Sequence, residues 1–214
     1  MDETQTTIHS YNQNAKAYAE KFMCHEPYTK QAKAFAELLR SGDSVLDIGC
    51  GPGNVAKQLL AAKALQLTGV DLSEEMVKLA SANVPSGRFY CQDIRQAEFV
   101  TGSFDAVVLS FSIVHLKDVE AEDLLRKAIS WTKRNGHLFV SFMAGKVAGF
   151  EQTSFSRQLI FFNYFDSDKI LQLLSDQGME IVHSEQQDYH EPDGTITKDH
   201  FLFARRSSPC EKSD

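Results

Sequence analysis

Residues 45–54 read VLDIGCGPGN, an apolar strand-like run that leads into a turn with three glycines. Glycine allows positive φ angles and close approach of the backbone to a ligand. The residues after the turn have helical spacing, and the amino end of a helix presents free N–H groups and a positive dipole. The pattern therefore predicts a strand, a turn and a helix that together bind a carboxylate or a phosphate.

This loop differs from the GxGxxG fingerprint of dinucleotide-binding proteins. Its spacing is GxGxG, Asn54 stands where the third fingerprint glycine would be, and Pro52 removes one backbone donor. Asp47 adds a negative charge just before the turn, which disfavours a pyrophosphate. Asp47 either lies near the ligand or organises the turn through backbone hydrogen bonds. A ligand with both a carboxylate and positive groups fits these residues.

Strand-like and helix-like segments alternate outward from this loop. Strands are expected at residues 44–49, 65–72, 87–92, 104–112 and 136–143, and helices at 54–62, 74–82, 121–133 and 168–177. Such alternation is typical of parallel βαβ units in an α/β sandwich. Two last strands, 179–186 and 196–206, are joined by the turn sequence at 191–194, which has no room for a crossover helix. They are expected to form an antiparallel pair at a sheet edge.

The two ends of the chain are expected to differ from its middle. Residues 1–10 and 207–214 are predicted to be flexible. Helices are predicted at residues 11–22 and 29–40, where apolar side chains recur at helical spacing. These helices would form a cap, 11–40, on one domain that spans residues 1–214.

Composition excludes several classes of protein. The chain has 214 residues, 43% hydrophobic and 24% charged, which suits one globular domain with a core. The net charge is −7 without a basic run, so no nucleic-acid partner is expected. Four cysteines without a CxxC pair indicate neither a metal site nor a disulfide framework. We expect no membrane partner and a cytoplasmic location, because no signal peptide or membrane-spanning run is visible.

Two further carboxylates follow the next strands. Asp71 stands twenty residues after Gly51, the spacing at which an acidic side chain binds ribose hydroxyls in such folds; the alternative is a place beside a helix N-cap. Asp93 can accept a hydrogen bond from an exocyclic amine or form an Asx turn. Leu72 and Met76 can supply an apolar wall. Since parallel strands end at one edge of a sheet, these side chains are expected to lie together.

With these segments the chain resembles the class I methyltransferases that use S-adenosylmethionine (SAM). The matching segments, in order, are VLDIGCGPGN (45–54), GVDLSEEMV (69–77), FYCQDI (89–94), FDAVVLSFSIVHL (104–116) and GHLFVSF (136–142). The resemblance implies a three-layer α/β sandwich whose mostly parallel seven-stranded sheet has an antiparallel last strand and the order 3-2-1-4-5-7-6. It implies SAM as cofactor and methyl transfer to an acceptor, expected to be a small molecule, and leaves the oligomeric state open.

The resemblance also implies particular site residues. The cofactor-binding set is Tyr18, Asp47, Gly49, Cys50, Gly51, Asn54, Asp71, Leu72, Met76, Asp93, Ile94, Ser110 and Phe111. Tyr18 would cover the methionine end, and Ser110 and Phe111 would lie beside the sulfonium. Cys50 is alternatively only a small side chain that fits a tight loop.

The acceptor side is less determined. His115 either acts as the catalytic general base or is a structural residue bonded to backbone. The aromatic side chains of residues 150–165 either line an apolar substrate cavity or pack a lid onto the sheet. Two other functions stay open: a SAM-binding regulator or partner subunit without catalysis, and a nicotinamide-dependent oxidoreductase, which the missing glycine and the reversed last strands disfavour.

Overall fold

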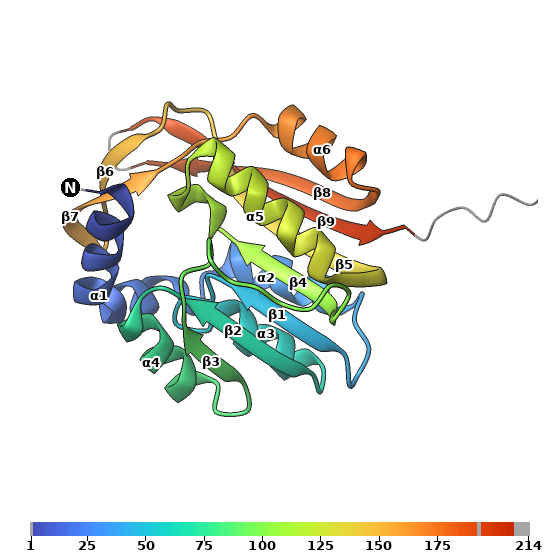
Figure 1. The fold of residues 1–214 in the computed structure, drawn as a ribbon. Helices are drawn as coiled ribbons and strands as arrows, with labels where there is room; N and C mark the ends of the chain where they lie inside the picture. Colours follow the sequence, from blue (N-terminus) through green and yellow to red (C-terminus); the bar gives the residue numbers. More distant parts are fainter. Residues whose placement is uncertain (1, 192–193, 208–214) are drawn as a thin grey trace, which may run out of the picture.

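A seven-stranded sheet forms the centre of the computed structural model, which describes residues 2–191 and 194–207 (Figure 1). Its strands are β1 (Ser44–Ile48), β2 (Gln66–Asp71), β3 (Arg88–Cys91), β4 (Phe104–Ser110), β5 (Thr132–Ala144), β8 (Met179–His190) and β9 (Ile196–Arg206). Strands β1 to β5 are parallel, and β9 runs antiparallel to both β5 and β8. The predicted α/β fold class is confirmed.

The strand order across this sheet is β3-β2-β1-β4-β5-β9-β8. The labels differ from the predicted numbering because two strands outside the sheet precede the last pair. Counted within the sheet alone, the order is 3-2-1-4-5-7-6. The two additional strands, β6 (Gly149–Thr153) and β7 (Ser156–Phe162), form a separate antiparallel hairpin that was not predicted.

Helices cover both faces of the sheet. They are α1 (Glu3–Phe22), α2 (Glu26–Ala36), α3 (Asn54–Ala62), α4 (Glu74–Asn83), α5 (Asp118–Trp131) and α6 (Ser167–Asp176), with a 3-10 turn η1 (Ile113–His115). Successive side chains of a strand point to opposite faces. Leu46 of β1 therefore packs in the core with α5 and α6, whereas its neighbour Val45 packs with α2 and α3.

Helix α1 corrects one prediction. It begins at Glu3, so the prediction of a flexible tail over residues 1–10 is wrong for residues 3–10. Thr7 is buried, and its hydroxyl accepts a hydrogen bond from the backbone N–H of Phe161 at 3.0 Å. This part of α1 docks on β7 through polar side chains, which carry no hydrophobic periodicity in the sequence.

The other terminal predictions fall mainly outside the described residues. The predicted flexible segment 207–214 does so from residue 208 on, and residues 192–193 of the predicted turn between β8 and β9 do so too. The antiparallel pairing of those two strands is confirmed. Among the described residues, no helix combines the length and the apolar character that crossing a bilayer requires.

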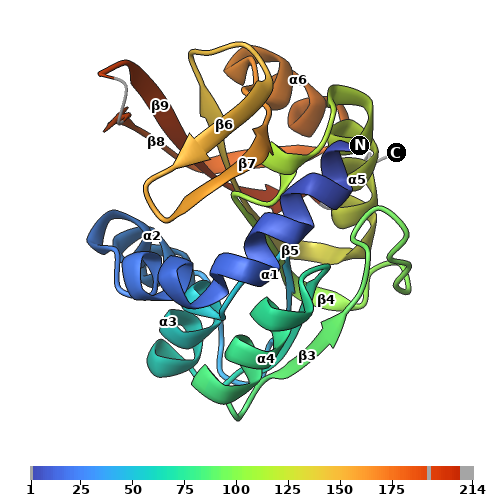
Figure 2. The same ribbon diagram turned by 90° about the vertical axis from the view of Figure 1, so that its left-hand side faces the viewer.

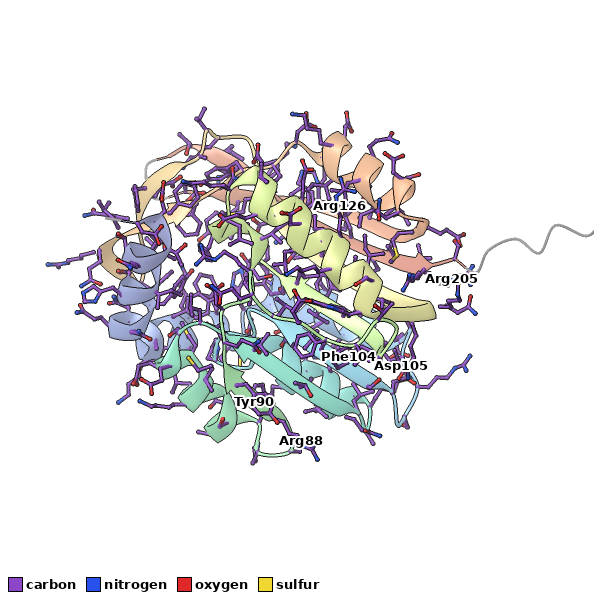
Figure 3. All side chains as sticks on the ribbon, in the orientation of Figure 1. Arg88, Tyr90, Phe104, Asp105, Arg126 and Arg205 are labelled. Atoms are coloured by element: carbon purple, nitrogen blue, oxygen red, sulfur yellow. The ribbon has the colours of Figure 1, made fainter. Side chains whose placement is uncertain are left out.

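The parallel strands end on the side of the sheet where α1 lies (Figure 1). Figure 2 looks onto this side and shows α1 crossing it between the β6–β7 hairpin and α4, both of which α1 contacts. The labelled side chains of Phe104 and Asp105 in Figure 3 lie at the other side, where β4 begins. The edge at which ligands bind in open α/β sheets is thus the one that α1 covers.

Candidate active site

A cavity lies at this edge, between the ends of β1, β2 and β4 on one side and α1 with the β6–β7 hairpin on the other. Most of the predicted site residues line it: Tyr18, Gly49, Gly51, Asp71, Leu72, Met76, Asp93, Ile94, Ser110, Phe111 and His115. Asp47, Cys50 and Asn54 are not among the residues that line it. Five separate segments of the sequence thus meet around one space.

The glycine loop has the backbone that its sequence predicts. Gly49, Gly51 and Gly53 have φ angles of 68°, 52° and 85°, in the region that glycine adopts without strain. A Cβ atom on Gly49 would lie 2.5 Å from the Cβ of Ser112, so the loop packs against the segment after β4 only because no side chain intervenes. The loop is therefore held close to two strand ends at once.

Asp71 ties this loop to the end of β2. Its carboxylate accepts hydrogen bonds from the backbone N–H groups of Gly51 and Ser73, both at 2.8 Å. Burial raises the pKa of Asp71, and these two backbone donors oppose the rise. The N-cap of α4 is Ser73, whose hydroxyl accepts from the N–H of Met76 at 3.2 Å. A carboxylate has about four acceptor sites, so Asp71 retains some that can accept from hydroxyl groups in the cavity.

Asp47 lies behind the loop in an unusual electrostatic position. Its side chain is 1% exposed, and neither carboxylate oxygen has a hydrogen-bond partner among the described residues. The alternative that Asp47 organises the turn through backbone hydrogen bonds is therefore wrong. Burial, together with the nearby charge of Asp71, raises the pKa of Asp47 to about 7. A buried carboxylate without a partner is costly, and a cationic group bound at the loop would supply the missing counter-charge.

The two remaining loop residues have structural positions. Cys50 is buried, and burial raises the pKa of its thiol well above the usual range, so it is not a reactive thiolate. This supports the alternative of a small side chain in a tight loop. Asn54 begins α3 after Gly53, which occupies the N-cap position.

Asp93 adopts the turn geometry that was its alternative role. Its carboxylate accepts from the backbone N–H of Arg95 at 3.0 Å and from the guanidinium at 2.8 and 3.0 Å. These bonds lower the pKa of Asp93. Arg95 also donates to Glu120 at 3.1 Å. Asp93 and Ile94 still line the cavity. Arg95 lines it too and was not predicted, although the DIR tripeptide places it two residues after Asp93.

His115 makes a hydrogen bond through each ring nitrogen. Its Nδ1 lies 2.9 Å from the carbonyl oxygen of Phe161, and its Nε2 lies 2.9 Å from the hydroxyl of Tyr11. Burial lowers the pKa of His115 to about 4, so the ring is neutral at physiological pH. Since a carbonyl only accepts, Nδ1 carries the proton and Nε2 accepts from Tyr11. His115 is therefore bonded to backbone, as the structural alternative stated, and also faces the cavity.

Aromatic rings from three segments form the wall opposite the strand ends. Phe155, in the turn between β6 and β7, stacks on Tyr11 with ring centroids 5.9 Å apart and meets the edge of Tyr18 at 5.1 Å. The segment 150–165 divides between its two predicted roles. Phe155, Phe162 and Tyr164 line the cavity, whereas Phe165 packs in the core.

Several residues that line the cavity were not predicted. Tyr11 lies seven residues before Tyr18, two turns earlier on the same helix face, and this spacing could have identified it. Asp199 lies in the mostly buried strand β9, where an acidic residue is out of place in a sequence pattern. Tyr28 gave no signal of its own. It reaches the cavity because α2 places it beside the first part of β9, where its hydroxyl bonds to Asp199.

Comparison with known proteins agrees with this arrangement. Residues 45–136 match a family model described as a methyltransferase domain. YqeM of Bacillus subtilis is 38% identical over 102 residues, which are 46% of this chain and 40% of that protein. Demethylmenaquinone methyltransferase of Thermotoga maritima is 26% identical over 181 residues, 72% of this chain and 78% of that protein.

A solved structure matches over almost the whole chain. It is magnesium protoporphyrin IX methyltransferase of Synechocystis PCC 6803 with bound SAM, which has a TM-score of 0.72 at 22% identity and covers 97% of this chain and 98% of its own. At that identity the likeness shows the fold. The chain spans only about two fifths of the length of YqeM. The matched segment, the fold and the glycine loop all agree with those of the class I S-adenosylmethionine-dependent methyltransferases.

Proposed function

We propose that this chain transfers the methyl group of SAM to a small-molecule acceptor. One observation carries the proposal: the glycine loop, Asp71 and Phe111 extend from three neighbouring strand ends and line a single cavity. The acceptors named for two relatives, demethylmenaquinone and magnesium protoporphyrin IX, are small molecules, which supports the same class here.

The residues present fit the cofactor. The N–H groups of the loop and of α3 would hold its carboxylate. The unpartnered carboxylate of Asp47, buried behind the loop, would balance the charge of its ammonium group without touching it. Asp71 would accept from the ribose hydroxyls. Leu72 and Ile94 would flank the adenine, with Asp93 beside its amine edge. When bound, SAM supplies an electrophilic methyl group, so the reaction needs no protein nucleophile.

The protein then contributes alignment and exclusion of water. Helix α1 and the β6–β7 hairpin cover the strand ends, and their aromatic rings make the wall apolar. Holding two reactants in the correct orientation can lower a barrier by about 7–11 kcal/mol in favourable cases. The cavity also extends past Phe111 to Tyr164 and Asp199. This space beyond the cofactor-binding residues favours catalysis over a SAM-binding subunit without an acceptor site.

A proton has to leave when the acceptor is a hydroxyl or an amine. The predicted general base, His115, would act through Tyr11, because the Tyr11 hydroxyl occupies its Nε2. Tyr11 would accept the proton of the acceptor while it gives its own to His115. The low pKa of His115 makes it a weak base in the free protein, so its main contribution would be to hold the Tyr11 oxygen in place.

Calorimetric titration with SAM and with its demethylated product, S-adenosylhomocysteine (SAH), tests the proposal. We expect micromolar binding, and we expect Asp71→Ala to weaken it about 10- to 100-fold, because hydrogen bonds to a charged group contribute about 1.5–3 kcal/mol. Asp123→Ala, a change at an exposed carboxylate on α5, serves as the matched control. Absence of binding to the wild-type chain would refute the proposal. If SAM binds, incubation of the chain with labelled SAM and metabolite pools would identify the acceptor.

A further inference from the structure

The end of the cavity away from the glycine loop is acidic. Three carboxylates line it: Glu151 from β6, Glu191 after β8 and Asp199 from β9. Lys146 lies 3.3 Å from the carboxylate of Glu151 and 3.8 Å from that of Glu191. The carboxylates of Glu151 and Glu191 therefore share a lysine, whereas Asp199 is not paired with it.

Asp199 is a buried carboxylate whose hydrogen-bond partners are neutral. It is 1% exposed and accepts from the hydroxyl of Tyr28 at 3.1 Å and from the side chain of Gln187. Within residues 2–191 and 194–207, no lysine or arginine forms an ion pair with it. Burial raises the pKa of Asp199 to about 6, so the carboxylate is mostly ionised at pH 8. A buried charge of this kind favours a ligand that brings the opposite charge.

Aromatic rings continue the surface around this carboxylate. Tyr28, which bonds to Asp199, has its ring centroid 4.8 Å from that of Phe111 and 6.0 Å from that of Phe22, and all three rings line the cavity. Phe111 has a φ angle of 51°, a conformation that costs a residue with a side chain about 1–3 kcal/mol. Its N–H donates to Ser141, which helps to hold this conformation. Aromatic faces attract cations through their quadrupole.

Within the described part of the chain, no unpaired positive side chain lines this end of the cavity to match an anionic acceptor. Of the described residues that line the cavity, Arg95 carries the positive charge, and its guanidinium is bonded to both Asp93 and Glu120. Lys21 reaches the rim from α1, where it interacts with Glu191 and Tyr189. Among the described residues in this part of the cavity, the charge that stays uncompensated is that of Asp199.

We propose that the acceptor carries a positively charged nitrogen, bound by the carboxylate of Asp199 and the rings of Tyr28 and Phe111. The inference rests on the proposed methyl transfer and names its substrate class, an organic amine or ammonium compound. The nitrogen is the group by which the acceptor is held.

Binding of three matched probes to the full chain loaded with SAH tests the inference. The probes are 2-phenylethylamine, 2-phenylethanol and 3-phenylpropionate, which share a ring and differ in charge. At pH 8 we expect the amine to bind about 10-fold more tightly than the alcohol, and the carboxylate to bind most weakly. Asp199→Asn should bring the amine and the alcohol within about 2-fold of each other while SAH affinity changes by less than about 2-fold.

Two further variants complete the experiment. Asp188→Asn changes an exposed carboxylate on β8 that is paired with Lys198 at 3.5 Å, and it should leave the amine preference intact. Tyr28→Leu keeps the charge of Asp199 and removes the aromatic face, so it should reduce the preference for the amine over the alcohol about 5-fold. This variant tests the inference even if Asp199→Asn does not fold.

The outcomes separate the two proposals. Equal binding of amine and alcohol by a wild-type chain that binds SAH would overturn the inference and leave the proposed function standing. The same preference in wild type and Asp199→Asn would also overturn it. Absence of SAH binding would overturn the proposed function, and with it the assignment of an acceptor.

Discussion

Replacing Asp47 with asparagine should make the free protein less sensitive to pH. Asp47 is buried without a hydrogen-bond partner among the described residues, and burial raises its pKa from 3.8 to about 7. In the unfolded chain the carboxyl loses its proton near 3.8, whereas in the folded chain it keeps it until about 7. A raised carboxyl pKa therefore removes stability as the pH rises through this window.

The structure sets the size of this effect. Each pH unit between the two pKa values is worth about 1.4 kcal/mol, so the part of the window between pH 5 and pH 7 corresponds to about 3 kcal/mol. The free energy of unfolding of the wild type should lose this amount between pH 5 and pH 8 through Asp47 alone. The asparagine variant cannot ionise at this position. It keeps an unpartnered buried amide, which costs about 1–3 kcal/mol at every pH.

Urea unfolding at pH 5 and pH 8 measures the effect as a double difference. The change between the two pH values is taken for the wild type and for Asp47→Asn, so that contributions from all other groups cancel. Asp123→Asn, a change at an exposed carboxylate of α5, is the control and should behave like the wild type. If Asp47→Asn and the wild type showed the same pH dependence, the buried, unpartnered state of Asp47 would be refuted.

Three other changes have expected outcomes. Gly49→Ala should destabilise the chain by about 2 kcal/mol or more in urea unfolding and abolish SAM binding in calorimetry, because its Cβ would lie 2.5 Å from that of Ser112. Tyr11→Phe should lower kcat in an assay with labelled SAM and leave SAH affinity unchanged, since it removes the hydroxyl bonded to His115; unchanged kcat would exclude a proton-transfer role. The folded pKa of His115 is about 4, below its ordinary 6.5, so its contribution to stability is complete above pH 6.5 and is lost as the pH falls to 4. His115→Gln should reduce that acid loss in urea unfolding by about 3 kcal/mol, and an unchanged acid transition would contradict the neutral buried ring.

The region from β1 to η1 could be predicted in detail from the sequence. Its glycine turn, its apolar strands and the acidic residues that follow them are local signals, and each lies within a few residues of the element it identifies. The parallel crossovers bring the ends of these strands to one edge of the sheet. Gly51 and Asp71 therefore meet there whatever the rest of the chain does, and the structure joins them by a 2.8 Å hydrogen bond.

The opposite wall of the cavity could not be predicted in this way. The helix α1 docks through buried polar side chains such as Thr7, and a pattern of polar residues gives no hydrophobic periodicity. Strands β6 and β7 were missed, although the side chains of β6 alternate in exposure as expected for a strand with one covered face.

The sequence by itself thus determined the fold class and the cofactor side of the site, because short-range patterns specify strands, turns and the edge at which they end. Only the tertiary structure decided which residues face the cofactor side across the cavity. It bonds Tyr11 to His115 across 104 positions of the chain, and Tyr28 to Asp199 across 171. Such pairs arise from how whole elements pack against one another, and packing depends on the shape and polarity of both surfaces at once, which no local stretch of sequence contains.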